Sequence, residues 1–202
     1  MPRLSRLESQ TLTRERLLTS ARQVFLRVGY VRATIDVIAD EAGYSKGAVY
    51  SNFESKEAIF LELLQEKLGA DVAGMRELLV AGTNVEQLIS AIRDYFAARE
   101  DVLDFTAVAA EFLTQVGHSS PHAERTAGLY REQRRAIADL LEALFEKAGR
   151  TPPAPAAEMA AATVSMTLGL AIQRGADRDA IPAVLWGKAI ETYVKAILAA
   201  AN

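Results

Sequence analysis

The 202-residue chain contains no cysteine, only two histidines and a single tryptophan. Without cysteine it can form no disulfide framework and no thiolate nucleophile, which fits a reducing compartment. Its longest uncharged run, Met159 to Gln173, has 15 residues, whereas a membrane span needs roughly 20. The polar start of the chain, with Arg3 and Arg6, is not typical of a signal peptide. We therefore expect a cytoplasmic protein without membrane contact.

Motifs for metal, phosphate or nucleophile chemistry are also missing. His118 and His122 have the i, i+4 spacing of two metal ligands, but Pro121 lies between them and no third ligand follows by spacing. Gly187-Lys188 lacks the upstream glycine of a phosphate-binding loop, and no G-x-S-x-G segment occurs. We predict no metal, no cofactor and no enzymatic activity. An all-α enzyme, or a small-molecule-binding protein with a central cavity, is the alternative.

Charge is distributed unevenly along the chain. Residues 1–56 hold nine Lys and Arg against six Asp and Glu, whereas the whole chain has a formal net charge of −3. A basic N-terminal part on an acidic remainder is compatible with polyanion binding at one end. So small an excess is equally compatible with chance.

Hydrophobic periodicity predicts an all-α fold of about nine helices. Apolar residues recur at helical spacing along nearly the whole chain, and no alternating β-pattern of useful length occurs. Residues that favour helix ends mark the boundaries. Thr34, Ser45 and Ser55 can each cap a helix by accepting a hydrogen bond from a free backbone N–H, Thr83 begins a segment with capping-box spacing, and Gly43 can end a helix.

The segment Thr34–Phe53, TIDVIADEAGYSKGAVYSNF, predicts a helix-turn-helix. Two short amphipathic helices are joined by Gly43-Tyr44-Ser45, and so tight a turn sets the second helix at a steep angle to the first. A protruding helix fits the DNA major groove, which is about 12 Å wide. Similar helix pairs also occur as simple hairpins in all-α proteins, so the pattern alone leaves that alternative open.

The second helix of this pair presents a small and hydroxylated face once Val49 and Phe53 are turned inward. The side chains expected to point outward are Gly47, Ala48, Tyr50 and Ser51, flanked by Lys46 and Asn52. Glycine and alanine permit close approach, while tyrosine and serine can donate to phosphates or base edges. Lys46 and Lys56, each at the start of a helix, can meet a phosphate.

Many residues between Thr13 and Leu64 occur at a characteristic fixed spacing. They are Ala21…Phe25…Gly29-Tyr30, Thr34…Ile38-Ala39…Ala42-Gly43, Ser45-Lys46-Gly47…Tyr50…Phe53 and Ser55-Lys56-Glu57. In these residues, about a quarter of the chain, the sequence resembles the DNA-binding domain of the TetR (tetracycline-repressor-like) family of bacterial transcription regulators. The resemblance implies an N-terminal three-helix domain, joined by a fourth helix to an all-helical body that binds a small molecule and forms a dimer.

By this resemblance, residues around the turn contact double-stranded DNA. Thr34, Ser45, Tyr50 and Lys56 would hold phosphates, and Tyr44, Lys46 and Gly47 would lie near bases or backbone. The family often has histidine or tyrosine where this chain has Asn52. An asparagine can donate to a phosphate or pair with adenine, and the sequence leaves both open.

The implied organisation has three parts. Residues 1–12 would form a flexible basic arm, which can enter a minor groove or be a disordered tail. Residues 13–56 would form the helix-turn-helix domain, and residues 57–202 the effector-binding and dimerisation domain. The implied function is a ligand-responsive repressor that binds a palindromic operator as a homodimer at the nucleoid, with activation left open.

Effector and dimer residues are predicted from the apolar faces of the later helices. The candidate effector residues, which suit an apolar or amphipathic ligand but are also typical of plain core, are Phe96, Phe105, Phe112, Tyr130, Met159, Thr163 and Met166. The candidate dimer residues are Leu170, Trp186, Ile190, Tyr193 and Ile197. They could form an intersubunit four-helix bundle, or pack within one subunit.

Overall fold

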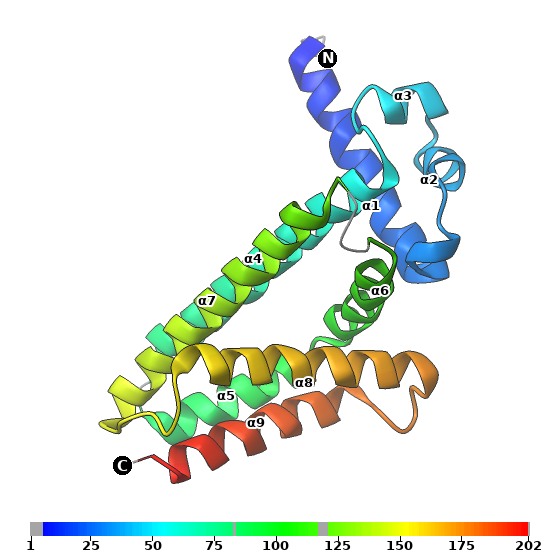
Figure 1. Ribbon diagram of the computed structural model, residues 1–202. Coiled ribbons are helices and arrows are strands. Elements are labelled where there is room, and N and C mark those ends of the chain that lie inside the picture. The colour runs from blue at the N-terminus through cyan, green and yellow to red at the C-terminus, as the bar shows by residue number, and fades with distance from the viewer. Residues whose placement is uncertain (1–5, 83, 117–120, 202) are drawn as a thin grey trace.

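The computed structural model describes residues 6–82, 84–116 and 121–201, and these residues form nine helices and no strand (Figure 1). In chain order they are α1 (Arg6–Arg32), α2 (Ile35–Ala42), α3 (Lys46–Tyr50), α4 (Lys56–Ala81), α5 (Val85–Ala97), α6 (Glu100–Val116), α7 (Ala123–Ala148), α8 (Ala156–Ala176) and α9 (Ala183–Ala199). The prediction of an all-α fold is confirmed. None of the helices in these ranges has the length and apolar character that a bilayer crossing requires.

The helices form a head and a body (Figure 1). The head consists of α1, α2, α3 and the first turns of α4, and the body consists of α5–α9 with the rest of α4. α4 and α7 run side by side along the length of the molecule, and α6 contacts both α1 of the head and α8 of the body. The body therefore meets the head through α4, α7 and α6.

Side-chain caps set the helix boundaries in the head. Thr34 Oγ1 accepts a hydrogen bond from Val37 N at 3.3 Å, and Ser45 Oγ accepts one from Ala48 N at 3.2 Å. Each side chain thereby satisfies a free N–H group in the first turn of α2 or α3. Gly43 ends α2 with φ of 71°, in the left-handed region that glycine adopts without strain. These predicted helix ends are confirmed.

Two predicted boundaries differ from the structure. Residues 6–12, expected to belong to a flexible arm, lie in α1, because no glycine or proline interrupts the helix there and Glu8 favours its N-terminus. α5 is capped by Asn84, whose Oδ1 accepts from Gln87 N at 2.9 Å. Thr83, the residue expected to act there, lies outside the described residues.

Two hydrophobic cores stabilise the molecule. The head core joins buried side chains of α1–α4 to Phe105 and Phe112 of α6. The ring of Phe60 lies at its centre, with centroid distances of 5.4 Å to Phe105 and 4.7 Å to Phe112. The body core joins α5–α9 around Trp186. Burial of each such ring contributes about 2 kcal/mol, so α6 is held to the head although it belongs to the body in sequence.

α5 and α9 approach closely at Gly187. A Cβ atom added there would lie 2.3 Å from Arg93 O and 3.0 Å from Ala97 Cβ, so this crossing requires a residue without a side chain. The neighbouring Trp186 packs against Phe96, with ring centroids 4.6 Å apart. The face of α9 that carries both residues is therefore covered by α5.

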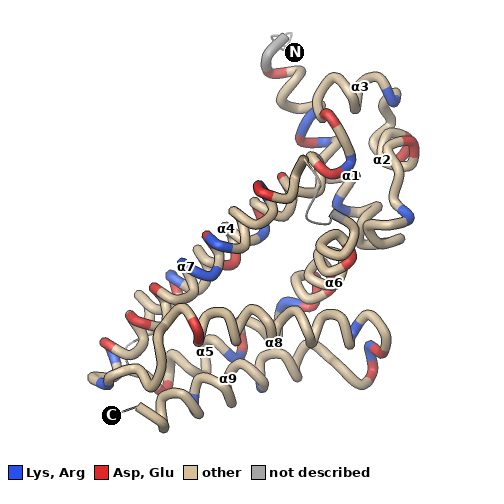
Figure 2. Tube along the Cα trace, in the orientation of Figure 1, with Lys and Arg blue, Asp and Glu red and all other residues tan. Residues whose placement is uncertain are grey.

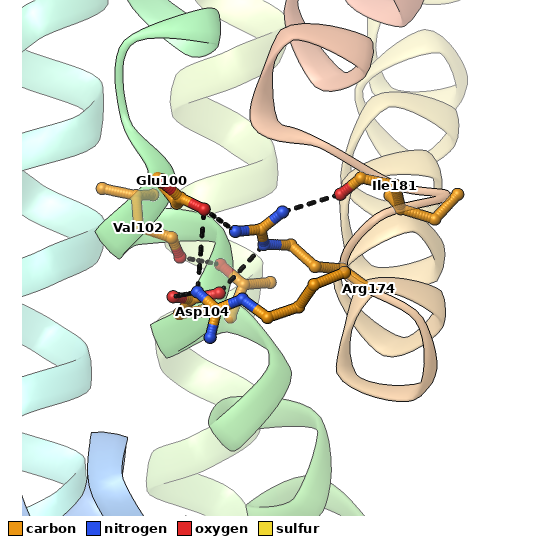
Figure 3. Close-up of polar contacts among 7 residues, drawn as sticks. Glu100, Val102, Asp104, Arg174 and Ile181 are labelled. Carbon is orange, nitrogen blue, oxygen red and sulfur yellow. Dashed lines mark hydrogen bonds and ion pairs between the residues drawn. The ribbon is translucent and has the colours of Figure 1, made fainter.

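A buried arginine connects α8 with the start of α6. Arg174 is 2% exposed and donates to Asp104 Oδ1 at 3.0 Å and to Ile181 O at 2.8 Å, and it also pairs with Glu100 (Figure 3). A charge removed from water is stable only when it is paired and hydrogen-bonded. These contacts hold α8 to α6 and to the segment that precedes α9.

The other end of α6 is attached to a kink in α1. Gly29 interrupts α1 with φ of 79°, and just beyond it Val31 N donates to Glu111 Oε2 at 3.3 Å. A Cβ atom on residue 29 would lie 2.8 Å from the same carboxylate. α6 therefore contacts the head through Glu111 near its C-terminus and α8 through Glu100 and Asp104 near its N-terminus.

Candidate nucleic-acid interface

α3 lies at the outer surface of the head, far from the body (Figure 1). Val49 is fully buried and Phe53 is 4% exposed, which turns the opposite face of the helix toward solvent. The exposed residues of this segment are Ser45, Lys46, Gly47, Tyr50 and Ser51, with Ala48 and Asn52 half-buried at its edges. The exposed face is the one that the sequence predicts to point outward.

The exposed face of α3 leaves room for a close partner. The nearest atom to a Cβ built on Gly47 would be Ser45 Oγ at 3.7 Å, so packing within the chain does not require glycine there. Tyr50 is 51% exposed although it is aromatic. This combination of open backbone and a projecting hydroxyl suits a helix that enters a major groove.

Lys46 and Ser45 can both reach a phosphate at the start of α3. Lys46 Nζ lies 2.9 Å from Asp36 Oδ1, and this carboxylate raises the pKa of Lys46. Because exposed ion pairs are weak, a phosphate can replace Asp36 as the partner. Ser45 Oγ accepts from the backbone as the cap of α3, and a hydroxyl that accepts can still donate.

Asn52 and Ser51 are hydrogen-bonded to their own helix. Asn52 Nδ2 donates to Ala48 O at 2.8 Å and to Ser51 Oγ at 3.3 Å, and Ser51 Oγ donates to Ala48 O at 2.8 Å. An amide has two N–H donors, and both are engaged in Asn52. Donation from Asn52 Nδ2 to a phosphate or to adenine N7 would first have to break these bonds.

Thr34 and Tyr44 connect elements within the head. Thr34 is exposed and caps α2. Tyr44 is half-buried against the head core, and hydrogen bonds from Thr13 and Arg16 of α1 lower the pKa of its hydroxyl. The structure thus places Tyr44 against α1, where it holds the turn between α2 and α3 to that helix.

Lys56 also has partners within the head. Its Nζ donates to Tyr30 O and to Ala33 O, both at 2.9 Å, and lies 4.3 Å from the centre of the Tyr30 ring. Burial lowers the pKa of this lysine. An ammonium group has three protons, so one remains for a phosphate at the start of α4.

Arg14 supports α3, although sequence reasoning did not select it. Its guanidinium lies 4.1 Å from the centre of the Phe53 ring, donates to Asn52 O at 2.5 Å and pairs with Glu62 of α4. These contacts fix the C-terminal end of α3 against α1 and α4. Its partners lie far along the chain, so no local pattern indicates the role.

The body contains two adjoining cavities of about 60 Å³ each. The first lies among α4–α9, and the second lies beside it between α4, α5, α7, α8 and α9. They share a wall formed by Met75, Phe96, Ile137 and Thr163. Among the candidate effector residues, Phe96, Tyr130 and Thr163 line the first cavity.

The other four candidate effector residues line neither cavity. Phe105 and Phe112 lie in the head core, Met159 is 3% exposed in the body core, and Met166 packs against that core. The two phenylalanines lie seven residues apart on one face of α6. Helical spacing shows that they share a face, but it does not show whether that face meets a cavity or another helix.

The prediction for the dimer interface is wrong for two residues. Trp186 is 1% exposed and Ile190 is 3% exposed within a single chain, so neither has surface to offer a second copy. Both lie on the side of α9 that packs into the body core. Leu170, Tyr193 and Ile197 are half-buried, and their place in an interface stays a prediction.

No group of three or more His, Cys, Asp or Glu side chains suited to a metal ion occurs within residues 6–82, 84–116 and 121–201. His118, one of the two histidines with ligand-like spacing, lies outside these ranges.

A short exposed helix, carried by a head of three helices, has the arrangement of a helix-turn-helix domain. The family described as "Bacterial regulatory proteins, tetR family" matches residues 17–63, and "BetI-type transcriptional repressor, C-terminal" matches residues 84–199, more than half of the chain. The chain therefore belongs to the tetR family of bacterial regulatory proteins.

Individual relatives agree with this assignment. The chain is 39% identical to the transcriptional activator FasR of Mycolicibacterium smegmatis over 84 residues, which cover 41% of the chain and 38% of FasR. It is 31% identical to the transcriptional repressor Rv1474c of Mycobacterium tuberculosis over 133 residues, 64% of the chain and 66% of that protein. The chain thus spans less than two thirds of either relative. The crystal structure of a transcriptional regulator from Rhodococcus sp. Rha1 has the same fold, with a TM-score of 0.74 at 24% identity over 93% of this chain and 97% of that one.

Proposed function

We propose that the protein is a ligand-responsive repressor that binds a palindromic operator as a homodimer, with α3 in the major groove of each half-site. The observation that carries this proposal is the exposed face of α3. Val49 and Phe53 anchor the helix so that Gly47 and Tyr50 face solvent, with Lys46 at its first turn. Because this face carries no arginine, sequence discrimination would depend on thymine methyl groups, hydroxyls and DNA shape.

An uncharged face of α8 supports the homodimer. α8 has no charged residue between Glu158 and Arg174, which Figure 2 shows as an uninterrupted tan stretch. Exposed or half-buried residues recur on it every three or four positions: Ala162, Ser165, Gly169, Ile172 and Ala176. Small side chains let two helices approach closely, and Ile172 is 54% exposed in the single chain. Two-fold symmetry would then present two α3 helices to half-sites ~34–36 Å apart or somewhat more.

The cavities of the body support effector binding. Sites for drug-sized ligands usually measure about 300–1,000 Å³, whereas each cavity here measures about 60 Å³. An effector would therefore have to widen them and so stabilise a different shape of the body. Only such a difference in affinity between two shapes can shift the protein away from its operator.

Operator binding is tested by gel shift at several salt concentrations, with the DNA that flanks the protein's own gene. Tyr50→Ala and Lys46→Ala should each weaken binding about tenfold, and the lysine variant should also reduce the salt slope by about one unit. Lys195→Ala removes an exposed lysine of α9 and is the matched control. Unchanged binding in both α3 variants would show that α3 does not bind in the major groove.

Dimerisation is tested by light scattering after size-exclusion chromatography. Ile172→Glu should give a monomer, because a charge would be buried without a partner at the symmetric contact. Val80→Glu, at a residue that is 87% exposed near the end of α4, should remain dimeric. A dimeric Ile172→Glu variant would exclude this face of α8.

A further inference from the structure

An amide oxygen without a hydrogen-bond donor lies in the wall of the first cavity. Gln133 of α7 lines this cavity, and its Oε1 is buried without a hydrogen-bond partner in the described part of the chain. Asp71 of α4 lines the same cavity, but its Oδ1 has an ionic partner, because Arg99 Nη2 lies 3.1 Å away. Both atoms are acceptors. Buried polar atoms are nearly always hydrogen-bonded, so the unpartnered Gln133 Oε1 points to a ligand that donates.

The charges around Asp71 decide which donor suits the cavity. Lys67 Nζ lies 2.5 Å from Asp71 Oδ2, and Arg99 Nη2 lies 3.1 Å from Asp71 Oδ1. Two cations therefore face one carboxylate, and the Lys67 side chain is only 10% exposed. A further positive charge would be repelled there. Asp71 already has ionic partners, whereas Gln133 Oε1 is neutral and can accept from an uncharged hydroxyl or N–H group.

The rest of the cavity suits an apolar chain. Phe96, Ile137 and Trp186 line the first cavity, and Phe96 and Ile137 also border the second. The second cavity continues between Ile190 and Val194 in surroundings that are almost wholly apolar. A molecule with a polar head at Gln133 would therefore extend its chain past Phe96 toward α9.

Gln133 also lies next to solvent. Gln133 and Leu68 line an open groove on the outside of α4 and α7 as well as the first cavity. These two side chains thus separate the groove from the cavity. The small residues Gly69 and Ala73 border the same groove, so a ligand can approach Gln133 from outside before its chain enters.

We propose that the effector is an uncharged amphipathic molecule whose hydroxyl or N–H group donates to Gln133 Oε1 while its apolar chain displaces the shared wall and occupies the two adjoining cavities. Gln133 is then the residue that selects the head group. This inference rests on the proposed function, because it takes the cavities as the effector site.

Ligand binding can be measured by the fluorescence of the single tryptophan. Trp186 lines the first cavity, so its fluorescence should change when the cavity fills. Three probes of equal chain length separate the head groups: 1-octanol donates, octyl methyl ether keeps the oxygen but has no O–H, and octanoate is an anion. We expect 1-octanol to bind at least about fivefold more tightly than the ether and more tightly than octanoate.

Variants of Gln133 assign the preference to this side chain. Gln133→Leu should bind the alcohol and the ether equally, whereas Gln133→Glu keeps an acceptor and should retain the preference for the alcohol. Gln65→Leu is the matched control, because Gln65 lines the outer groove but not the cavity, and it should behave as the wild type.

Three results would overturn the proposal: no response to 1-octanol in the wild type, tighter binding of octanoate than of 1-octanol, or a preference for the alcohol that survives Gln133→Leu. Gel shifts without any probe keep the two proposals apart. Normal operator binding without a preference for the alcohol rejects this inference alone, whereas a wild type that binds no operator rejects the proposed function.

Discussion

Gly47 in the head and Gly187 in the body show how differently the two parts of the molecule use the same residue. The nearest non-neighbouring atom to a Cβ built on Gly47 is Ser45 Oγ at 3.7 Å, whereas at Gly187 a backbone oxygen of α5 lies 2.3 Å away. The space at Gly187 is filled by the chain itself. The space at Gly47 is open to solvent, as expected where a helix faces an external partner. A small residue therefore indicates close approach, and only the structure shows what approaches.

The largest effect on stability is expected for Gly187→Ala. The added Cβ would meet Arg93 O, which is backbone and cannot turn away, so α9 must shift from α5. We expect the free energy of unfolding to fall by about 3 kcal/mol in urea denaturation. Gly69→Ala is the matched control, because no atom lies within 4 Å of its Cβ position, and it should be neutral or stabilising. Equal stability of the two variants would contradict the close crossing.

Arg174→Met is expected to lower the free energy of unfolding by a similar or slightly smaller amount, about 3 kcal/mol. It leaves Asp104 without its buried partner and releases α8 from α6. Arg178→Met removes a neighbouring arginine whose side chain is 61% exposed and should change little. The midpoints of thermal denaturation of the two variants are compared with that of the wild type. An equally large decrease in Arg178→Met would show that the burial of Arg174 does not explain its effect on stability.

Gly47→Val, unlike Gly187→Ala, should change operator affinity more than stability. Because a Cβ at this position would meet only Ser45 Oγ at the ordinary contact distance of 3.7 Å, the free energy of unfolding should stay within about 0.5 kcal/mol of the wild type. Operator affinity in gel shifts should fall about tenfold or more, since a branched side chain would hold α3 away from the bases. If Gly47→Val keeps the operator affinity of the wild type, a surface other than this face of α3 must contact the DNA.

The smallest effect is expected for Asn52→Ala. Both amide N–H groups of Asn52 are engaged within the head, so the change should lower the free energy of unfolding by about 1 kcal/mol. Operator affinity should stay within about twofold of the wild type. A much larger loss of affinity would mean that Asn52 leaves Ala48 to reach the DNA.

The head was more predictable than the body for a physical reason. The caps Thr34 and Ser45 and the turn at Gly43 depend on neighbours within three or four residues, which the sequence displays directly. The outward face of α3 followed from the inward positions of Val49 and Phe53. The engagement of Asn52 by Ala48 O is also local, but the amide has several competing partners and its rotamer is not visible in a pattern.

In the body, helical spacing identified apolar faces but not what covers them. The spacing leaves open whether Trp186 and Ile190 face a second copy or pack within one chain, and in the structure α5 covers them within the same chain. For Phe105 and Phe112 the sequence leaves open a ligand site or plain core, and in the structure they pack in the head core. Each outcome depends on contacts between residues far apart in the sequence, which periodicity alone does not resolve.

The partition between the first cavity and the head core is only one side chain thick. Leu64, Leu68 and Ala109 line that cavity on one side and belong to the head core on the other. A molecule that pushes this wall outward therefore presses on the packing that supports α1–α3. No long relay of residues is needed to connect the first cavity with α1–α3, because the cavity and the head core share these side chains.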